Sequence, residues 1–316
     1  MGEPAPLFAT DRAPAPAGAT AEWFIGAAGA RLRAGFFPAV GRVRGSVVLS
    51  PGRTEPVEKY FEVAGELNAR GFAVVAHDWR GQGLSQRLLL ERLKGHAVGF
   101  HDVLADYHAL IQAFETRLPE PRLALGHSMG GGLTALALAK GEQRFAAAVL
   151  TAPMFGIFTK PLPPSVTRAI AAALSRLGLG GAIVPGASLA APPPPFESNG
   201  LTHDPTRYAR NVEQVTMHPD LALGPPTWGW LDFAFAAIEE LRRGEGPSKV
   251  TIPVTVVAAG DDLLVDNRVL RLVTGRFPRG EYIEIAGAYH EILQETDDLR
   301  AVFWREFDAL AAVIAP

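Results

Sequence analysis

The stretch LALGHSMGGG at residues 123–132 decides the fold of this 316-residue chain. It begins as an apolar run typical of a buried β-strand, and an Ala- and Leu-rich helical pattern follows over residues 129–140. Between the two lies Gly-x-Ser-x-Gly, a nucleophile elbow in which a sharp strand-to-helix turn presents the Ser128 hydroxyl. Such a turn requires small neighbours, which Gly126 and Gly130 supply. The motif therefore predicts Ser128 as a catalytic nucleophile.

The same two patterns, an apolar run and then a helix, alternate along most of the chain. The runs are nearly continuous in apolar character, which suits strands buried on both faces of a parallel sheet. We expect an α/β fold with a mostly parallel sheet of about eight strands, helices on both faces, and antiparallel edge strands near residues 23–25 and 31–37. The expected buried strands are residues 46–50, 72–77, 122–126, 146–151, 254–259 and 282–286, and the expected helices are 57–69, 101–117, 129–140, 267–277 and 297–313.

The alternation stops between residues 154 and 245, where no strand-like run occurs and Gly and Pro are frequent. Three helix starts are visible there: Ser165 as an N-cap, Asp204 followed by Pro205, and Thr227. Because ligands bind at the carboxyl ends of the strands in open α/β sheets, we expect this insertion to form a helical cap over that edge. The predicted division is residues 1–153 and 246–316 for the two parts of the core and residues 154–245 for the cap.

The base that activates Ser128 has few candidates. A serine hydroxyl is a weak nucleophile and needs a base that a third group orients. In this kind of site the chain order is serine, acid, histidine. Only His203, His218 and His290 follow Ser128. His290 comes directly after the last expected strand and is the predicted base, whereas the other two belong to the cap.

The acid should follow the strand at residues 254–259, where Asp261, Asp262 and Asp266 all qualify. Asp262 lies close enough to the strand to meet His290 with little slack in the loop, and it is the favoured acid. Asp266 opens a helical pattern and is the expected N-cap of that helix, but it stays open as the alternative acid.

Acyl transfer also needs hydrogen-bond donors aimed at the developing oxyanion. One should be the backbone N–H of Met129, the residue after the nucleophile. The other should come from the loop after residues 46–50, and because Pro51 has no N–H, Arg53 is the predicted donor. The alternative reading of Arg53 is a surface salt bridge with Glu55.

The composition excludes several classes of function. With 30 basic and 33 acidic residues and a net charge of −3, the chain has no basic stripe for nucleic acid. The absence of cysteine excludes disulfides and thiolate chemistry and is compatible with a cytoplasmic location. His290-Glu291 is not a zinc motif, because the position four residues after His290 is Gln294; we expect no metal and no cofactor. The Pro/Ala-rich residues 1–20 lack a secretory signal and are expected to form a loose tail or a strap.

Several motifs together resemble the bacterial lysophospholipase and monoacylglycerol lipase group of α/β-hydrolases. The bacterial lysophospholipases are the closer match, since monoacylglycerol lipases carry His-Gly where this chain has PGR. The motifs that carry the resemblance are SPGRTE at 50–55, HDWRGQGLS at 77–85, GHSMGG at 126–131, LTAPMFG at 150–156, THDPTRYARN at 202–211, GPPTW at 224–228, VDNR at 265–268 and GAYHEIL at 287–293.

The resemblance implies the α/β-hydrolase fold with Ser128 as nucleophile, His290 as base and Asp262 as acid. It also implies that residues 78–85 are structural and not catalytic. The expected reaction is hydrolysis of lysophospholipids or monoacylglycerols through an acyl-enzyme, with acyl transfer when an alcohol replaces water.

The cap supplies apolar surface suited to an acyl chain. We expect Met154, Phe155, Phe158, Trp228 and Trp230 to line the substrate site, although each could instead belong to the cap's own core. The apolar face of residues 165–177 suggests peripheral contact with the inner face of the membrane.

Two other functions remain open from the sequence. A serine aminopeptidase of the same fold would need an acidic pocket for a free amine, for which Glu55, Glu197 or Asp232 could serve. A non-catalytic binding protein is the other alternative, and the complete set of serine, histidine and acid argues against it. The oligomeric state cannot be predicted.

Overall fold

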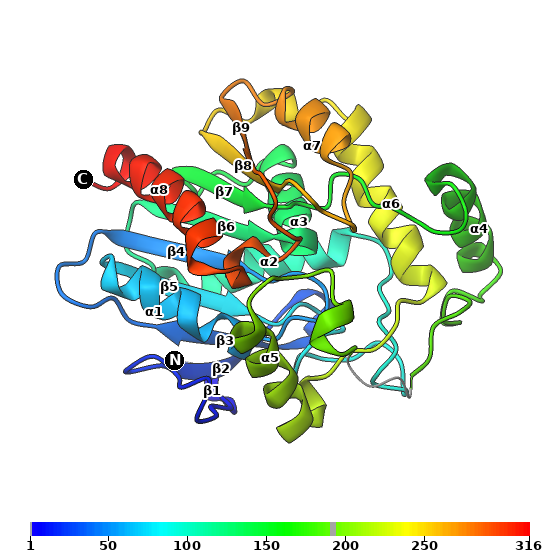
Figure 1. Cartoon of the computed structure of the whole chain (residues 1–316), viewed down its shortest axis with the longest axis horizontal. Helices are drawn as coiled ribbons and strands as arrows, with labels where there is room; N and C mark the ends of the chain where they lie inside the picture. The colour runs from blue at the N-terminus through cyan, green and yellow to red at the C-terminus, as the bar shows by residue number, and fades with distance from the viewer. Residues whose placement is uncertain (1, 190–193) are drawn as a thin grey trace.

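A sheet of nine strands forms the centre of the computed structural model, which describes residues 2–189 and 194–316 (Figure 1). The strand order is β1-β2-β3-β5-β4-β6-β7-β8-β9. The pairs β1–β2, β2–β3 and β3–β5 are antiparallel. All the remaining neighbours pair parallel. The strands are β1 (Glu3–Pro4), β2 (Thr20–Ile25), β3 (Arg31–Phe37), β4 (Gly45–Ser50), β5 (Phe72–His77), β6 (Arg122–His127), β7 (Ala147–Thr151), β8 (Val254–Ala259) and β9 (Gly280–Ile285).

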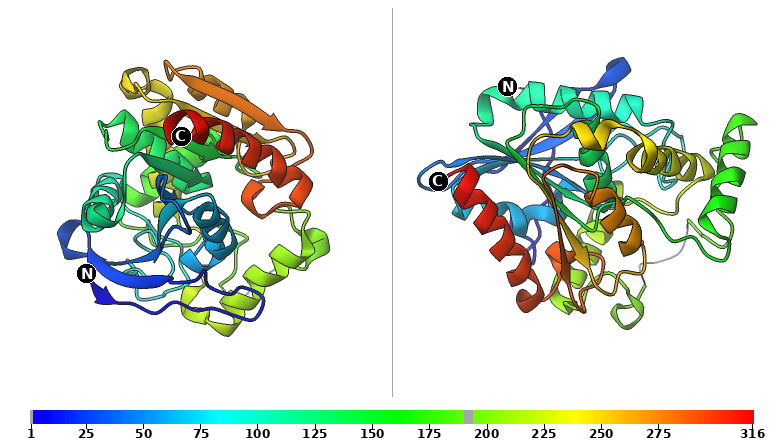
Figure 2. Two further views of the ribbon diagram at one scale, coloured as in Figure 1. Left: turned by 90° about the vertical axis from the view of Figure 1, so that its left-hand side faces the viewer. Right: turned by 90° about the horizontal axis from the view of Figure 1, so that it is seen from above.

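Helices cover both faces of the sheet. Helices α1 and α8 lie on one face and α2 and α3 on the other, as the view from above in Figure 2 shows. The helices are α1 (Phe61–Ala69), α2 (His101–Phe114), α3 (Ser128–Ala139), α4 (Pro164–Arg176), α5 (Pro205–Met217), α6 (Trp228–Arg243), α7 (Asn267–Thr274) and α8 (Asp297–Ile314).

The predicted α/β architecture is confirmed. Every residue of β4, β5, β6, β7 and β8 is buried, as the continuous apolar runs indicated. Strand β1 was not predicted, because two residues are too short to produce a pattern. It forms where Glu3 lies opposite Trp23 of β2, and this pairing ties the start of the chain to the sheet as a strap.

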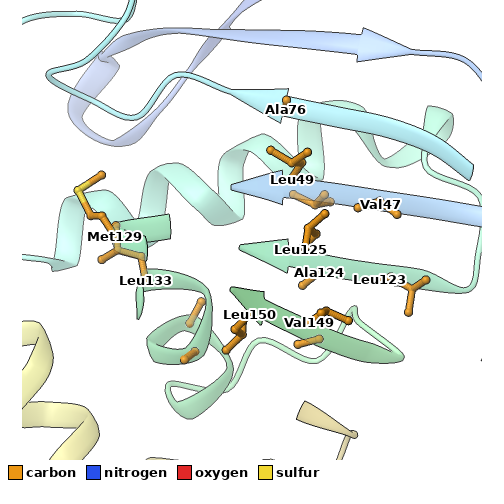
Figure 3. Close-up of a cluster of buried hydrophobic side chains, with 14 of the residues drawn as sticks. Val47, Leu49, Ala76, Leu123, Ala124, Leu125, Met129, Leu133, Val149 and Leu150 are labelled. Carbon is orange, nitrogen blue, oxygen red and sulfur yellow. The ribbon is translucent and has the colours of Figure 1, made fainter. Parts of the chain in front are cut away.

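The main hydrophobic core supports the turn at Ser128. Figure 3 shows apolar side chains of β4, β6 and β7 gathered beside the first turns of α3. Leu133 is fully buried there, and Met129 is nearly so. Because α3 is held by this packing, the strand-to-helix turn that precedes it has little freedom to move.

The segment between β7 and β8 contains α4, α5 and α6, and its residues 190–193 lie outside the described part of the chain. Helix α6 belongs to two hydrophobic clusters: Phe233 and Leu241 are part of the main core, whereas Phe235 packs with Ala171 of α4. The core therefore reaches into the segment predicted as a cap, and the domain division remains a proposal.

The helix starts expected in this segment are confirmed at two of the three positions. The side chain of Asp204 caps α5 and that of Thr227 caps α6. The prediction of Ser165 as an N-cap is wrong. The N-cap is Pro163, two residues earlier, and helix α4 begins at Pro164, because proline is favoured at the first helical position.

A buried ion-pair network lies at the antiparallel side of the sheet. The Arg33 guanidinium donates to the Asp78 carboxylate from Nε at 2.7 Å and to Glu58 from Nη1 and Nη2, each at 2.7 Å. All three side chains are 0% exposed. Asp78 also accepts the backbone N–H groups of Val57 and Leu84. This network, which we call the Arg33 cluster (Arg33, Glu58 and Asp78), agrees with a structural role for residues 78–85.

Candidate active site

The Ser128 side chain is placed by a strained turn. Ser128 has φ of 51°, in the left-handed region that L-residues other than glycine rarely adopt. The turn brings the start of α3 so close to β4 that a Cβ on Gly130 would lie 2.1 Å from the carbonyl oxygen of Ser50. Glycine is therefore required at residue 130.

Three side chains from distant parts of the chain form one hydrogen-bonded line. The Ser128 Oγ lies 2.8 Å from His290 Nε2, and His290 Nδ1 lies 2.7 Å from Asp262 Oδ2. Asp262 follows β8 and His290 follows β9, so adjacent parallel strands deliver both groups to the same edge. With Nδ1–H donating to Asp262, Nε2 is free to accept the Ser128 proton.

The Asp262 carboxylate is held on both oxygens. Its Oδ1 accepts the N–H groups of Leu264 at 2.7 Å and Val265 at 3.0 Å. Burial opposes its ionisation, but the hydrogen bond and charge of His290 together with these N–H groups outweigh burial and lower the pKa of Asp262. The acid is therefore ionised at neutral pH and able to orient the imidazole.

The other sequence candidates lie elsewhere. Asp266 is the N-cap of α7, where it accepts the backbone N–H of Arg268 and pairs with that residue's guanidinium. His203 bonds to Glu295 through Nδ1 at 2.9 Å, and His218 stacks on Phe8. The structure thus brings Asp262 and His290 to Ser128, and it leaves Asp266 out.

The two predicted oxyanion donors border the same cavity. In the described part of the chain, no acceptor bonds to the backbone N–H of Arg53 or of Met129. The loop around Arg53 is nevertheless fixed, because Glu55 accepts the N–H of Gly52 at 2.5 Å and Gln82 accepts the N–H of Thr54 at 2.7 Å. Two N–H groups without an acceptor, on residues that line the same cavity as Ser128, suit an oxyanion site.

A cavity of about 310 Å³ opens beside Ser128 and His290. Of the predicted lining residues, Met154, Phe158 and Trp230 line it. Phe155 does not: it is fully buried in the main core, where it packs against Phe277. Trp228 does not line the cavity either, since it packs on the second hydrophobic cluster, formed by Ala171, Leu231 and Phe235. Sequence reasoning missed the aliphatic lining residues, which are Ile157, Leu201, Leu231, Leu264 and Val265.

A second buried charge network borders the cavity. Lys59 Nζ lies 2.8 Å from Glu55 and 2.6 Å from Glu291, and Tyr60 donates to Glu55 at 2.6 Å. Burial raises the pKa of Glu55, but the charge of Lys59 and the hydrogen bonds from Lys59 and Tyr60 reverse this and lower it to about 2. Burial lowers the pKa of His127 to about 4, so this ring is neutral. The expected alternative of a surface salt bridge between Arg53 and Glu55 is therefore wrong, since Glu55 is buried and paired with Lys59.

The strand order, the turn at Ser128 and the residues that follow β8 and β9 define an enzyme of the α/β-hydrolase class. More narrowly, the chain belongs to the family described as serine aminopeptidase, S33, whose model matches residues 41–297.

Several proteins that are similar to this chain have names that refer to lipid esters. The chain is 38% identical to lysophospholipase L2 of Escherichia coli over 269 residues, which cover 81% of this chain and 77% of that protein. It is 27% identical to monoacylglycerol lipase of Mycolicibacterium smegmatis, with 80% and 84% covered. Among solved structures, a soluble variant of Saccharomyces cerevisiae monoglyceride lipase with a substrate analog matches with a TM-score of 0.73, 18% identity, and 93% and 95% covered. The last match supports the fold alone.

Proposed function

We propose that the protein hydrolyses carboxylic esters of lipids, specifically lysophospholipids or monoacylglycerols, with Ser128 as the nucleophile. The observation that carries the proposal is the hydrogen-bonded line from Ser128 through His290 to Asp262 at the wall of a largely apolar cavity. The relatives named lysophospholipase and monoacylglycerol lipase support the lipid character of the substrate.

In the first half of the reaction His290 Nε2 takes the Ser128 proton as Oγ attacks the ester carbonyl carbon. Asp262 holds the ring orientation and stabilises the imidazolium that forms. The N–H groups of Arg53 and Met129 bind the oxyanion of the tetrahedral intermediate. His290 then donates its proton to the leaving alcohol, which departs and leaves the acyl group on Ser128.

Water completes the reaction by the same steps, with His290 as base and then as acid. An alcohol bound in place of water would yield acyl transfer. The acyl chain would lie along Met154, Phe158, Trp230 and the aliphatic side chains of the cavity wall, which present mostly carbon to it.

We further infer a peripheral membrane contact through this part of the molecule. Phe158, Leu162, Val166 and Leu177 lie on or next to α4 and are at least 40% exposed. Of the helices that the structure describes, none has the length and apolar character needed to cross a bilayer. A contact through α4 would place lipid substrates near the cavity, and a cytoplasmic location on the inner face remains a prediction.

The test compares wild type with Ser128→Ala on a short p-nitrophenyl ester and on monooleoylglycerol. We expect at least a thousandfold loss of kcat in Ser128→Ala. Ser165→Ala, which removes an exposed hydroxyl at the start of α4, is the matched control and should behave as wild type. Equal rates for wild type and Ser128→Ala would refute the proposal, as would failure of a fluorophosphonate probe to label Ser128.

An aminopeptidase would need a free carboxylate to bind the substrate amine. Glu197 and Asp232 do not line the cavity. Glu55 does, but its carboxylate already holds Gly52, Lys59 and Tyr60. We therefore favour ester hydrolysis over the peptidase. Faster release of nitroaniline from an aminoacyl-nitroanilide than of nitrophenol from the matched ester would reverse this choice.

A further inference from the structure

Arg53 carries a partly buried guanidinium that is not paired with a carboxylate in the described part of the chain. Its Nη2 donates to the carbonyl oxygen of Gly224, and its buried Nε has no acceptor. Within residues 2–189 and 194–316 the group forms no salt bridge. Burial lowers its pKa to about 10, so Arg53 is still a cation at neutral pH. A cation that is partly withdrawn from water without a paired anion is unfavourable, which suggests that another molecule supplies the anion.

Arg87 shows what a purely structural unpaired arginine looks like in this chain. Burial lowers the pKa of Arg87 to about 10 as well. Its Nη1 and Nη2 atoms, however, donate to backbone carbonyl oxygens of Gly81, Gly83, Arg92, Asp220 and Ala222. Arg87 therefore joins segments of the protein, whereas the Arg53 guanidinium makes one hydrogen bond, from Nη2 to Gly224, within the described part of the chain.

The Arg53 guanidinium is held in a defined place on the cavity wall. Its carbon lies 5.2 Å from the centre of the Trp230 ring, and both residues line the cavity. A Cβ on Gly95 would lie 2.3 Å from Arg53 Nη2, so the absence of a side chain at Gly95 makes room for the group. The cation is thus positioned before any ligand arrives, which lowers the entropic cost of binding.

The length of the Arg53 side chain suits the spacing of ester and phosphate in a lysophospholipid. The backbone N–H of Arg53 is the proposed donor to the ester oxyanion, and the guanidinium sits at the other end of the same side chain. In a lysophospholipid, the glycerol backbone separates the ester from the phosphate by a comparable run of single bonds. A guanidinium matches phosphate oxygens in both charge and fork geometry.

The acidic residues of the cavity do not compete for this cation. Glu55 and Glu291 both line the cavity, but each is bound to Lys59. Their charge is partly balanced there, and neither forms a salt bridge with Arg53. The cavity therefore presents an apolar wall for an acyl chain and one unsatisfied cation for a polar head.

We propose that the Arg53 side chain binds the phosphate of a lysophospholipid headgroup and makes the enzyme prefer lysophospholipids over uncharged monoacylglycerols. This inference rests on the proposed ester hydrolysis at Ser128. The Arg53 side chain would select between the two substrate classes, and the Arg53 backbone N–H would bind the oxyanion.

The test measures kcat/KM for oleoyl lysophosphatidylglycerol and for monooleoylglycerol, both below their critical micelle concentrations. We expect wild type to prefer the phosphate-bearing substrate. Arg53→Met should lower the ratio of the two kcat/KM values by about 30-fold or more, as expected when one partner of a buried charge pair is removed. Arg53→Lys should restore part of the ratio, because lysine keeps the positive charge but lacks the planar guanidinium that can donate two parallel hydrogen bonds.

The outcomes separate this inference from the function on which it rests. If wild type hydrolyses both lipids and Arg53→Met leaves the ratio unchanged, the phosphate role is wrong and the ester hydrolase stands. If wild type hydrolyses neither lipid, the proposed function itself fails. If oleate inhibited wild type but not Arg53→Met, and the ratio did not change, Arg53 would bind the carboxylate of the fatty acid product. This result would overturn the proposal.

A second variant and a binding measurement avoid any change at Arg53 itself. Gly95→Ala should displace the guanidinium and lower the ratio, while the Arg53 backbone stays in place. With wild type, sn-glycerol 3-phosphate should inhibit hydrolysis of the p-nitrophenyl ester competitively, and glycerol at equal concentration should not. Equal inhibition by the two compounds would contradict a phosphate site.

Discussion

Arg33 and Arg53 both lie away from bulk water, but Arg33 is fully buried and Arg53 is only partly buried. Arg33 lies beneath the antiparallel side of the sheet, where Glu58 and Asp78 saturate its guanidinium. Burial lowers the pKa of Arg33, but these two carboxylates more than reverse the effect and raise it. Arg53 has no such partners, and burial alone lowers its pKa.

The difference separates two uses of buried charge in one molecule. The charges of the Arg33 cluster satisfy one another, so their contribution is to hold β3, the residues before α1 and the loop after β5 together. The charges that border the cavity are arranged around the place where a substrate would lie. Changes in the first region should alter stability, and changes in the second should alter catalysis.

The largest effect should come from the acid at the cavity. Asp262→Asn keeps the side-chain shape but favours the wrong tautomer of His290, so kcat should fall by about 10⁴-fold. The midpoint of urea unfolding should change little. Asp266→Asn is the matched control: it alters a helix cap and should retain activity. If Asp266→Asn lost activity and Asp262→Asn kept the kcat of wild type, the acid would be Asp266.

The Arg33 cluster should give the opposite pattern. Arg33→Met leaves the Glu58 and Asp78 carboxylates buried without their cation, and the free energy of unfolding should fall by about 3–5 kcal/mol. The kcat of the fraction that remains folded should match wild type. Arg31→Met removes an exposed pair with Glu3 and should cost less than about 1 kcal/mol. Similar losses in the free energy of unfolding of Arg33→Met and Arg31→Met would show that the buried Arg33 cluster contributes no more to stability than an exposed ion pair.

Both arginines were visible in the sequence, but their partners were not. Residues 78–85 were recognised only through a family motif, since no local pattern reveals that Asp78 meets Arg33, 45 positions earlier in the chain. The aspartate after β8 and the histidine after β9 could be expected, because parallel strands bring successive loops to one edge. The expectation that Asp266 caps a helix is confirmed, and the choice of Asp262 as the acid stays a prediction.

The cavity lining was harder to predict. Aromatic residues were expected to line it, but Phe155 and Trp228 pack into hydrophobic clusters, and Ile157, Leu264 and Val265 line it instead. A large apolar side chain gains about as much from a protein core as from a pocket wall, so residue type does not separate the two. The isolated β-bridge between Ile157 and Val265, which brings these segments together, depends on tertiary packing that the sequence does not reveal.

A smaller effect is expected from His77, which ends β5 next to Asp78. Its Nε2 is buried without a hydrogen-bond partner, and burial lowers its pKa to about 3. The unfolded chain takes up this proton near pH 6.5, while the folded protein does not until about pH 3, so stability falls as pH drops through that window. His77→Phe should make the fall shallower by about 1.4 kcal/mol per pH unit, measured by urea unfolding.

The exposed ring of His101 provides the control for the change of side chain, because His101→Phe makes the same substitution without removing a buried group. His127 has the same sign of effect, with a pKa lowered to about 4 by burial, so some acid sensitivity should remain in His77→Phe. An unaltered slope in His77→Phe would show that the folded protein accepts a proton at His77.

The smallest effect, and the one that bears most directly on the comparison, is that of Arg53→Met on stability. The substitution removes an uncompensated, partly buried charge, and it also removes a hydrogen bond to Gly224 and a contact with Trp230. These changes oppose one another, so the free energy of unfolding should stay within about 1 kcal/mol of wild type and is expected to rise. The changes in the free energy of unfolding of Arg53→Met and Arg33→Met should therefore differ in sign as well as in size. A loss of about 3 kcal/mol or more in Arg53→Met would mean that the fold depends on this cation, and Arg53 would then belong with the structural charges of the Arg33 cluster.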